Sequence, residues 1–220
     1  MLGLAAWAFP LFEIRPLSWQ SVPRESVDAL LLGSANALRH GGEALSLYRG
    51  MPAYAVGAST AEAAREIGLD VVRVGKGGLQ QVLGELLPAH RRLLRLAGRE
   101  RVELTPPRDT VMITREVYAS EALPIPREMA DQLADGAIVL LHSGEAAAHL
   151  ALQCDRAGIA RDQVTLATIG PRVSERAGRG WASVRSASSP DDPALLALAA
   201  QICKEAASGS QLPEQGQAAD

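Results

Sequence analysis

The sequence has few cysteines and little net charge, and these absences exclude several functional classes. Its two cysteines, Cys154 and Cys203, lie 49 positions apart and form no Cys-x-x-Cys pair. This scarcity indicates a reducing compartment and unreactive thiols, and the spacing matches no metal-ligand motif. The net charge is only −3, so no overall positive field is available. We therefore expect no binding to nucleic acid or to an anionic membrane surface.

Long apolar runs are also missing. Segment 2–12 is apolar, but it has no basic region before it, contains Pro10 and is too short to span a bilayer. Elsewhere the sequence has no run of the roughly 18 apolar residues that a transmembrane helix needs. We expect a cytoplasmic protein. Residues 208–220 have almost nothing to bury, so we expect a disordered tail there.

What the chain does contain is a repeat. Two stretches show the same order of landmarks: an apolar strand followed by serine, a helix, and a second apolar strand ending in glycine. Ser34 precedes Gly57 by 23 positions, and Ser143 precedes Gly170 by 27. The repeat predicts two similar α/β units, with a cleft between them as a natural place for an anionic ligand.

The pattern of apolar residues predicts the elements of both units. Continuous apolar runs, typical of parallel strands buried on both faces, occupy residues 29–32, 53–56, 137–141 and 166–169. Helical periodicity occupies residues 61–67, 79–87, 145–157 and 194–205. Ser59 and Glu62 match a capping box that would open one of these helices. The alternation predicts an α/β fold with parallel sheets.

Two further extended segments, 11–15 and 110–118, bracket the first unit. If they pair, the chain leaves one domain, builds the second and returns. We therefore predict domain 1 from residues 1–14 and 120–207, and domain 2 with its connecting ladder strands from residues 15–119. Domain 1 begins abruptly at Met1, and we expect it to lack its N-terminal strand.

Small polar residues follow the predicted strands. Each turn would expose free backbone amides at the positive end of a helix, and several such turns together could hold a polycarboxylate. An ordinary helix N-cap explains any single turn as well, so convergence on one cleft would decide between the two. The candidate binding residues are Ser34, Ala35, Asn36, Gly57, Ser59, Thr60, Ser143, Gly144, Gly170, Pro171 and Arg172.

Tyr118 is a separate candidate because it closes the predicted return strand at the crossing between domains. A phenol there could donate a hydrogen bond to bound ligand without carrying a charge. Packing of the ring at the hinge is an equal alternative.

Other motifs point to no chemistry. His142, Glu145 and His149 lack His-Glu-x-x-His spacing, so we expect no metal site. Ser143 lies outside any Gly-x-Ser-x-Gly motif, and no convincing acid and base pair accompanies it for a hydrolase. Segment 75–78 is rich in glycine but lacks the P-loop pattern, so we interpret it as a strand-to-helix turn.

Taken together, these residues resemble the uroporphyrinogen-III synthase family. Segment 31–37 is similar to its strand-Thr-Ser-x-Asn-Ala turn, and segment 54–61 to its Val-Gly-x-x-Thr-Ala turn. Val117-Tyr118 is similar to its Val-Tyr return strand. The last motifs of the family, in the same order along the chain, resemble Ile169-Gly170-Pro171 and then Gly180-Trp181. The resemblance extends from about residue 5 to about residue 200.

The resemblance implies two flavodoxin-like parallel-sheet domains joined by a two-stranded β-ladder. It also implies cyclisation of hydroxymethylbilane, a linear tetrapyrrole with eight carboxylates, to uroporphyrinogen III with inversion of ring D. The resemblance implies no cofactor, and the chain would be a monomer. Tyr118 would assist loss of the terminal hydroxyl.

Two departures from the family pattern affect side-chain contacts. Gly33 stands where the family usually has threonine, and Arg172-Val173 replace the hydroxyl residues often found after Gly-Pro. Arg172 could compensate by pairing with a substrate carboxylate. The family also begins with a strand and helix, which we expect to be missing from this sequence. A noncatalytic module that binds small anions is the alternative interpretation, because fold alone does not define function.

Overall fold

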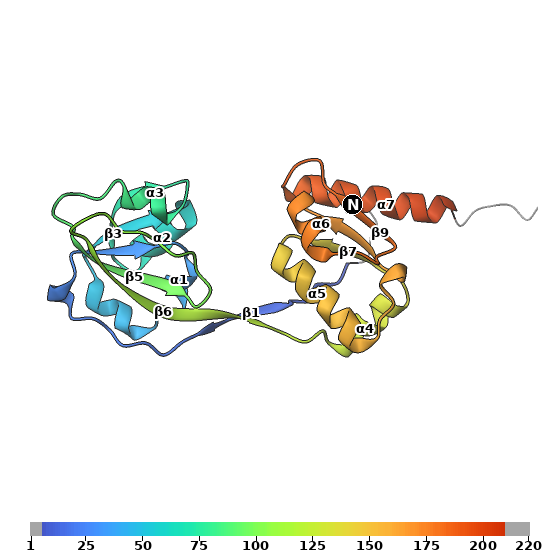
Figure 1. The fold of residues 1–220 in the computed structure, drawn as a ribbon, viewed down its shortest axis with the longest axis horizontal. Coiled ribbons are helices and arrows are strands. Elements are labelled where there is room, and N and C mark those ends of the chain that lie inside the picture. Colours follow the sequence, from blue (N-terminus) through green and yellow to red (C-terminus); the bar gives the residue numbers. More distant parts are fainter. Residues whose placement is uncertain (1–5, 210–220) are drawn as a thin grey trace, which may run out of the picture. The chain divides into compact units, whose positions relative to one another are not determined.

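The structure is a computed structural model that describes residues 6–209 (Figure 1). Its internal contacts divide the chain into two compact units. Unit 1 comprises Met1–Phe12 and Ala122–Asp220, and unit 2 comprises Glu13–Glu121. The chain therefore passes from unit 1 into unit 2 and back again.

Unit 2 contains a six-stranded sheet whose order is β1-β6-β5-β2-β3-β4. The strands are β1 (Phe12–Pro16), β2 (Ala29–Leu32), β3 (Pro52–Val56), β4 (Asp70–Gly75), β5 (Arg92–Gly98) and β6 (Val111–Ala122). The five strands from β2 to β6 pair in parallel. Every residue of β2 is buried, as the continuous apolar run predicted.

The order of these five strands corrects one expectation. Numbered along the chain from β2, they lie in the order 3-2-1-4-5, whereas a flavodoxin-like sheet has the order 2-1-3-4-5. The flavodoxin-like description is therefore wrong for this sheet. Apolar runs predict that strands are buried and parallel, but strand order depends on the side of β2 to which each crossover returns.

β1 and β6 are neighbours in the sheet. The amide of Leu17 donates to the carbonyl of Val117, and the amide of Leu123 donates to the carbonyl of Leu11. The partner number rises as the residue number falls, so the two segments run antiparallel. β6 extends to Ala122, which places Tyr118 inside this strand and not at its end as we had expected.

Helices cover both faces of the unit 2 sheet. α1 (Asn36–Arg39) and α2 (Ala58–Glu66) contribute to an apolar core that includes Leu30, Leu32, Leu94 and Leu96. α3 (Leu79–Leu83) contributes to a second core with Leu31, Tyr54 and Leu93. Alternate residues of β2 and β5 therefore serve opposite faces. Short 3-10 helices occupy Arg24–Ser26 and Glu43–Tyr48.

Unit 1 contains a parallel sheet in the order β7-β8-β9 within the described residues. Its strands are β7 (Ile138–Leu141), β8 (Thr165–Thr168) and β9 (Ser183–Ser186). α4 (Arg127–Ala134), α5 (Gly144–Ala157) and α6 (Pro171–Ala177) share one core, and α7 (Asp192–Gly209) packs in another. A 3-10 helix spans Arg161–Gln163. Figure 1 shows α5 and α7 on opposite sides of this sheet.

Element boundaries show where the sequence patterns were wrong. α2 begins at Ala58 with Gly57 as its N-cap, so Ser59 lies inside the helix and the capping box is wrong. Gly57 has φ 80°, a left-handed conformation that glycine adopts without strain. α7 includes the first two residues of the expected tail, and residues 210–220 lie outside the described residues. Among residues 6–209, no helix is long and apolar enough to cross a membrane.

Candidate functional site

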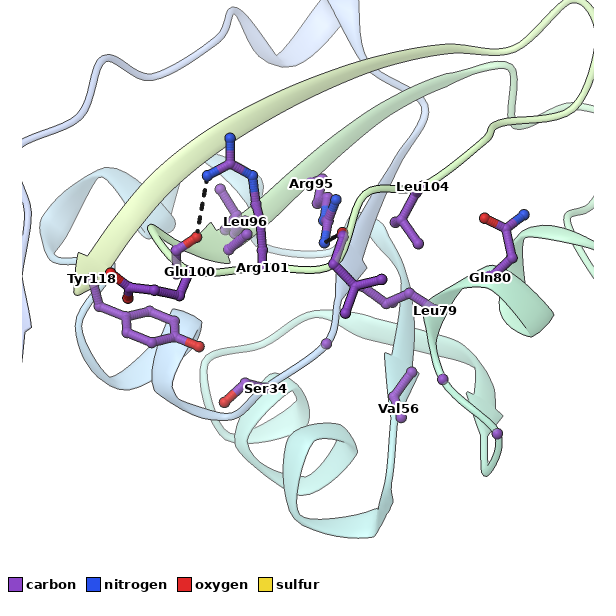
Figure 2. A pocket seen from close by; sticks show the side chains of 16 residues that line it. Ser34, Val56, Leu79, Gln80, Arg95, Leu96, Glu100, Arg101, Leu104 and Tyr118 are labelled. Atoms are coloured by element: carbon purple, nitrogen blue, oxygen red, sulfur yellow. Dashed lines mark hydrogen bonds between the residues drawn. The ribbon is translucent and has the colours of Figure 1, made fainter. Parts of the chain in front are cut away.

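A pocket of about 420 Å³ lies within unit 2 (Figure 2). Its lining includes Gly33 and Ser34, which follow β2, and Leu96, Ala97 and Gly98, which end β5. The strand order reverses between β2 and β5, because β3 and β4 lie beyond β2 and β6 lies beyond β5. Ligands of parallel α/β sheets bind outside the carboxyl ends of the strands at such a switch point.

Loop 99–110, which connects β5 to β6, forms one wall of this pocket. Parallel strands are usually joined by a helix, but this crossover contains none. Gln80, in α3, exchanges two hydrogen bonds of 2.9 Å with the backbone of Thr105. The Arg95 guanidinium donates through Nη2 to the carbonyl of Val102 at 2.8 Å. The loop is thus held over the sheet from two sides.

Ser34 occupies the turn between β2 and α1. Its Oγ accepts a hydrogen bond from the amide of Asn36 at 3.2 Å, and Ala35 is the N-cap of α1. This contact satisfies one of the free amides at the start of the helix. Ser34 lines the pocket, whereas Ala35 and Asn36 are not among its lining residues.

Tyr118 reaches the same pocket from β6. It pairs in register with Gly98, after an irregularity between Ala97 and Gly98. Its ring also lies 6.4 Å from the ring of His40, centroid to centroid. Figure 2 shows Tyr118 and Ser34 at one end of the pocket. The structure therefore brings together two of the residues that the sequence singled out.

The turn after β3 contributes differently. Val56, at the end of β3, lines the pocket, but Gly57, Ser59 and Thr60 do not. The side chain of Ser59 is exposed, whereas Thr60 is only 3% exposed within α2. This turn therefore presents a backbone and a serine to solvent, while its threonine is buried.

Sequence reasoning missed the charged residues of the pocket. Arg95 lies inside β5 and is 4% exposed, and Glu100 and Arg101 follow in the adjoining loop. Arg101 forms a 2.6 Å ion pair with Glu116. The one signal in the sequence was an arginine in the middle of the apolar run 93–97. Because the sequence patterns predict no strand at residues 92–98, they do not single out this arginine.

The glycine-rich segment 75–78 forms a turn and also contributes to the pocket. Gly75 ends β4 and Gly78 is the N-cap of α3, so the predicted strand-to-helix turn is confirmed. Gly77 and Gly78 line the pocket as well. A methyl group on Gly33 would come within 2.9 Å of the Leu79 side chain. A side chain larger than glycine at position 33 would therefore require the Leu79 side chain to move.

In unit 1, the candidate turns follow two neighbouring strands. Ser143 is the N-cap of α5, and its Oγ accepts from the amide of Ala146 at 3.5 Å. Gly170 is the N-cap of α6 and Pro171 opens that helix. Because β7 and β8 are parallel neighbours, both turns lie at the carboxyl edge of the same sheet. Ser143 and Arg172 are exposed there.

The histidines near these turns each have a different partner. His142 Nε2 lies 2.9 Å from Asp192 Oδ1, and His149 Nε2 lies 2.7 Å from the carbonyl of Leu123. Glu145 accepts from Arg176 at 2.8 Å. Among the residues that the structure describes, no group of three or more His, Cys, Asp or Glu side chains could hold a metal ion.

The fold and pocket define an α/β protein whose parallel sheets present small polar turns and backbone amides at their carboxyl edges. Proteins of this class hold small anionic molecules at those edges. Comparison with protein families identifies a match over residues 1–197, to the family described as uroporphyrinogen-III synthase HemD. The chain belongs to the uroporphyrinogen-III synthase family. It is an enzyme of tetrapyrrole and haem biosynthesis, a lyase that acts on a small-molecule tetrapyrrole.

Solved structures of the same family resemble this chain. One is uroporphyrinogen-III synthetase from Helicobacter pylori, at 16% identity and a TM-score of 0.60, covering 87% of this chain and 91% of that chain. Another is a mutant uroporphyrinogen III synthase from the extremely thermophilic bacterium Thermus thermophilus, at 16% identity and a TM-score of 0.47, covering 93% and 91%. The first likeness supports the α/β fold. No curated protein sequence matches the chain.

Proposed function

We propose that this chain converts hydroxymethylbilane to uroporphyrinogen III with inversion of ring D, using Tyr118 and the strand-end turns. One observation carries the assignment of residues: Tyr118, whose role the family resemblance implies, lines the same pocket as Ser34 at the switch point of the unit 2 sheet. Ligand binding at such a point is the general behaviour of parallel α/β sheets.

The first step is loss of the terminal hydroxyl to give an azafulvene. The phenol of Tyr118 donates a hydrogen bond to the departing oxygen, which stabilises the negative charge that develops there. The azafulvene carbon is then attacked by the substituted carbon of ring D, and the spiro intermediate fragments and recloses. These later steps require the ends of one molecule to be held close together, so orientation is the main contribution of the protein.

The strand-end turns bind the carboxylates of the substrate. In unit 2 these are Ser34, Ala35, Asn36, Gly57, Ser59 and Thr60. In unit 1 they are Ser143, Gly144, Gly170, Pro171 and Arg172. Backbone amides at helix N-termini favour anions through both hydrogen bonds and the helix dipole. Arg172 adds an exposed guanidinium for one carboxylate.

The experiment couples the chain to a source of hydroxymethylbilane and separates the oxidised products into type I and type III isomers. Uncatalysed closure gives isomer I, so isomer III above the control without enzyme is the expected result. Isomer I alone, together with tight binding of hydroxymethylbilane, would favour a noncatalytic binding module.

We also propose that the two units are separate domains of a cytoplasmic monomer, with boundaries near residues 14 and 120. The division of contacts at Phe12 and Ala122 supports these boundaries. Light scattering after size-exclusion chromatography should give the 23.2 kDa mass of one chain. A mass twice as large would contradict the monomer.

A further inference from the structure

The unusual feature of the unit 2 pocket is Arg95. It lies in the middle of β5, between Leu94 and Leu96, and its side chain is 4% exposed. Its neighbours on the same strand pack in the two apolar cores. Burial lowers the pKa of the Arg95 guanidinium, and the nearby positive charge of Arg101 lowers it further, while Glu103 opposes this change.

The hydrogen-bonding capacity of this guanidinium is largely unused. Nη2 donates to the carbonyl of Val102, but Nε is buried and has no hydrogen-bond partner. Among the ion pairs of residues 6–209, none includes Arg95. A buried charge without a carboxylate partner destabilises the folded chain, so the hydrogen bond to loop 99–110 does not by itself explain a buried arginine here.

The surroundings favour a negatively charged ligand. Arg95 and Arg101 line the pocket together with a single acidic residue, Glu100, and Arg101 is already paired with Glu116. The backbone of Gly77 and Gly78 lines the same pocket. Figure 2 shows Arg95 among the pocket residues, with Leu79 and Leu104 nearby. Apolar walls that surround one guanidinium strengthen its attraction for a carboxylate.

We propose that Arg95 is the buried anchor for one carboxylate side chain of the linear tetrapyrrole, which enters the unit 2 pocket and pairs with the guanidinium. This inference rests on the proposed function for the identity of the ligand. A planar guanidinium can bind a carboxylate through two parallel hydrogen bonds, which orients the ligand as well as holding it. Arg95 would therefore set the position of the substrate relative to Tyr118.

The kinetic test uses three variants of the full chain with hydroxymethylbilane as substrate. Arg95→Met should raise KM by about 10- to 100-fold, because one charged hydrogen-bonding partner is lost. Arg95→Lys should restore part of this loss, since an ammonium keeps the charge but not the two-pronged geometry. The matched control is Arg65→Met, which removes an exposed arginine in the last turn of α2 and should leave KM unchanged. Unchanged KM in Arg95→Met would overturn the proposal.

A second measurement does not depend on turnover and observes ligand binding by the wild-type chain. The Nε–Hε signal of Arg95 in the 15N-labelled wild-type chain, assigned by its loss in Arg95→Lys, should shift when uroporphyrinogen III is added without oxygen. A signal that stays in place at saturation, while other signals move, would overturn the proposal and leave Arg95 as a residue that holds the loop. If the chain forms no isomer III but this signal shifts, the proposed function fails and the carboxylate site stands.

Discussion

The ring of Tyr118 lies so close to Gly98 that a methyl group on Gly98 would come within 2.8 Å of two ring carbons. The two residues are partners on neighbouring parallel strands, β6 and β5. A glycine at this position is therefore what allows the phenol to lie over the end of β5 and line the pocket.

The substitution Gly98→Ala tests this contact. We expect the free energy of unfolding to fall by about 1–3 kcal/mol, because the added methyl group forces the ring or the strand to move. Urea denaturation measures the change. In a Tyr118→Ala background the same substitution should cost much less, since the ring is gone. Equal costs in the two backgrounds would show that the ring is not what excludes the methyl group.

Tyr118→Phe tests the catalytic role. We expect kcat to fall by about 10- to 100-fold with little change in KM, because the phenol assists loss of the hydroxyl but the ring is retained. The control is Tyr54→Phe, which removes hydrogen bonds to Leu87 and His90 away from the pocket. That control should lose about 1 kcal/mol of stability and keep its kcat. An unaltered kcat in Tyr118→Phe would remove this residue from the mechanism.

A substitution of Arg172 tests the contribution of unit 1 to substrate binding. Arg172→Ala should raise KM for hydroxymethylbilane about 3- to 10-fold, because an exposed guanidinium contributes only modestly to pairing with a carboxylate. kcat should be preserved. Arg179→Ala is the matched control, since Arg179 is also exposed and contacts Arg161 through its backbone carbonyl, which the substitution keeps. Similar KM values for the two variants would argue against the role of Arg172.

The stability of unit 2 should depend on pH through the carboxylate of Asp28. A hydrogen bond from the Arg92 side chain is the main cause that lowers the pKa of Asp28 to about 2, and the amides of Arg91 and Arg92 assist. Because the folded-state pKa is below the unfolded value, the stabilisation is present above pH 4 and is lost as the pH falls toward 2. The amount is about 1–2 kcal/mol, since Arg92 is half exposed and solvent screens the pair.

Urea denaturation between pH 5 and pH 2 measures this effect. The fall in unfolding free energy over that range should be smaller in Asp28→Asn than in the wild type, because the variant has no carboxylate to protonate at this position. Arg92→Met should raise the pKa of Asp28 toward its ordinary value. A fall of equal size in all three proteins would contradict the assignment.

Three hydroxyl groups form a cluster at the carboxyl edge of the unit 1 sheet. Thr168 Oγ1 lies 2.7 Å from Ser174 Oγ and 3.2 Å from Ser186 Oγ, and Thr168 is fully buried. Thr168→Val keeps the shape and removes the hydroxyl, so we expect a loss of about 1–2 kcal/mol. Thr165→Val, at the other end of β8, is the control and should cost less. Equal losses, measured by thermal or urea unfolding, would contradict a specific role for the cluster.

Several features followed from the sequence alone. The apolar runs predicted β2, β3, β7 and β8, because a strand buried on both faces leaves a continuous apolar signature. The turns that follow these strands, together with Val117-Tyr118, identified the family. These features are local, so a few consecutive residues determine each of them.

Only the tertiary structure decided how those pieces combine. Strand order, the pocket between the ends of β2 and β5, and the contact of Gly98 with Tyr118 all join segments far apart in the chain. Arg95 illustrates the difference between sequence and tertiary structure, because the sequence shows only an arginine in an apolar run. Its burial, its unpaired Nε and its place in the pocket arise because β5 lies inside the sheet with loop 99–110 beside it. Local patterns determine elements, whereas long-range packing determines which side chains share a site.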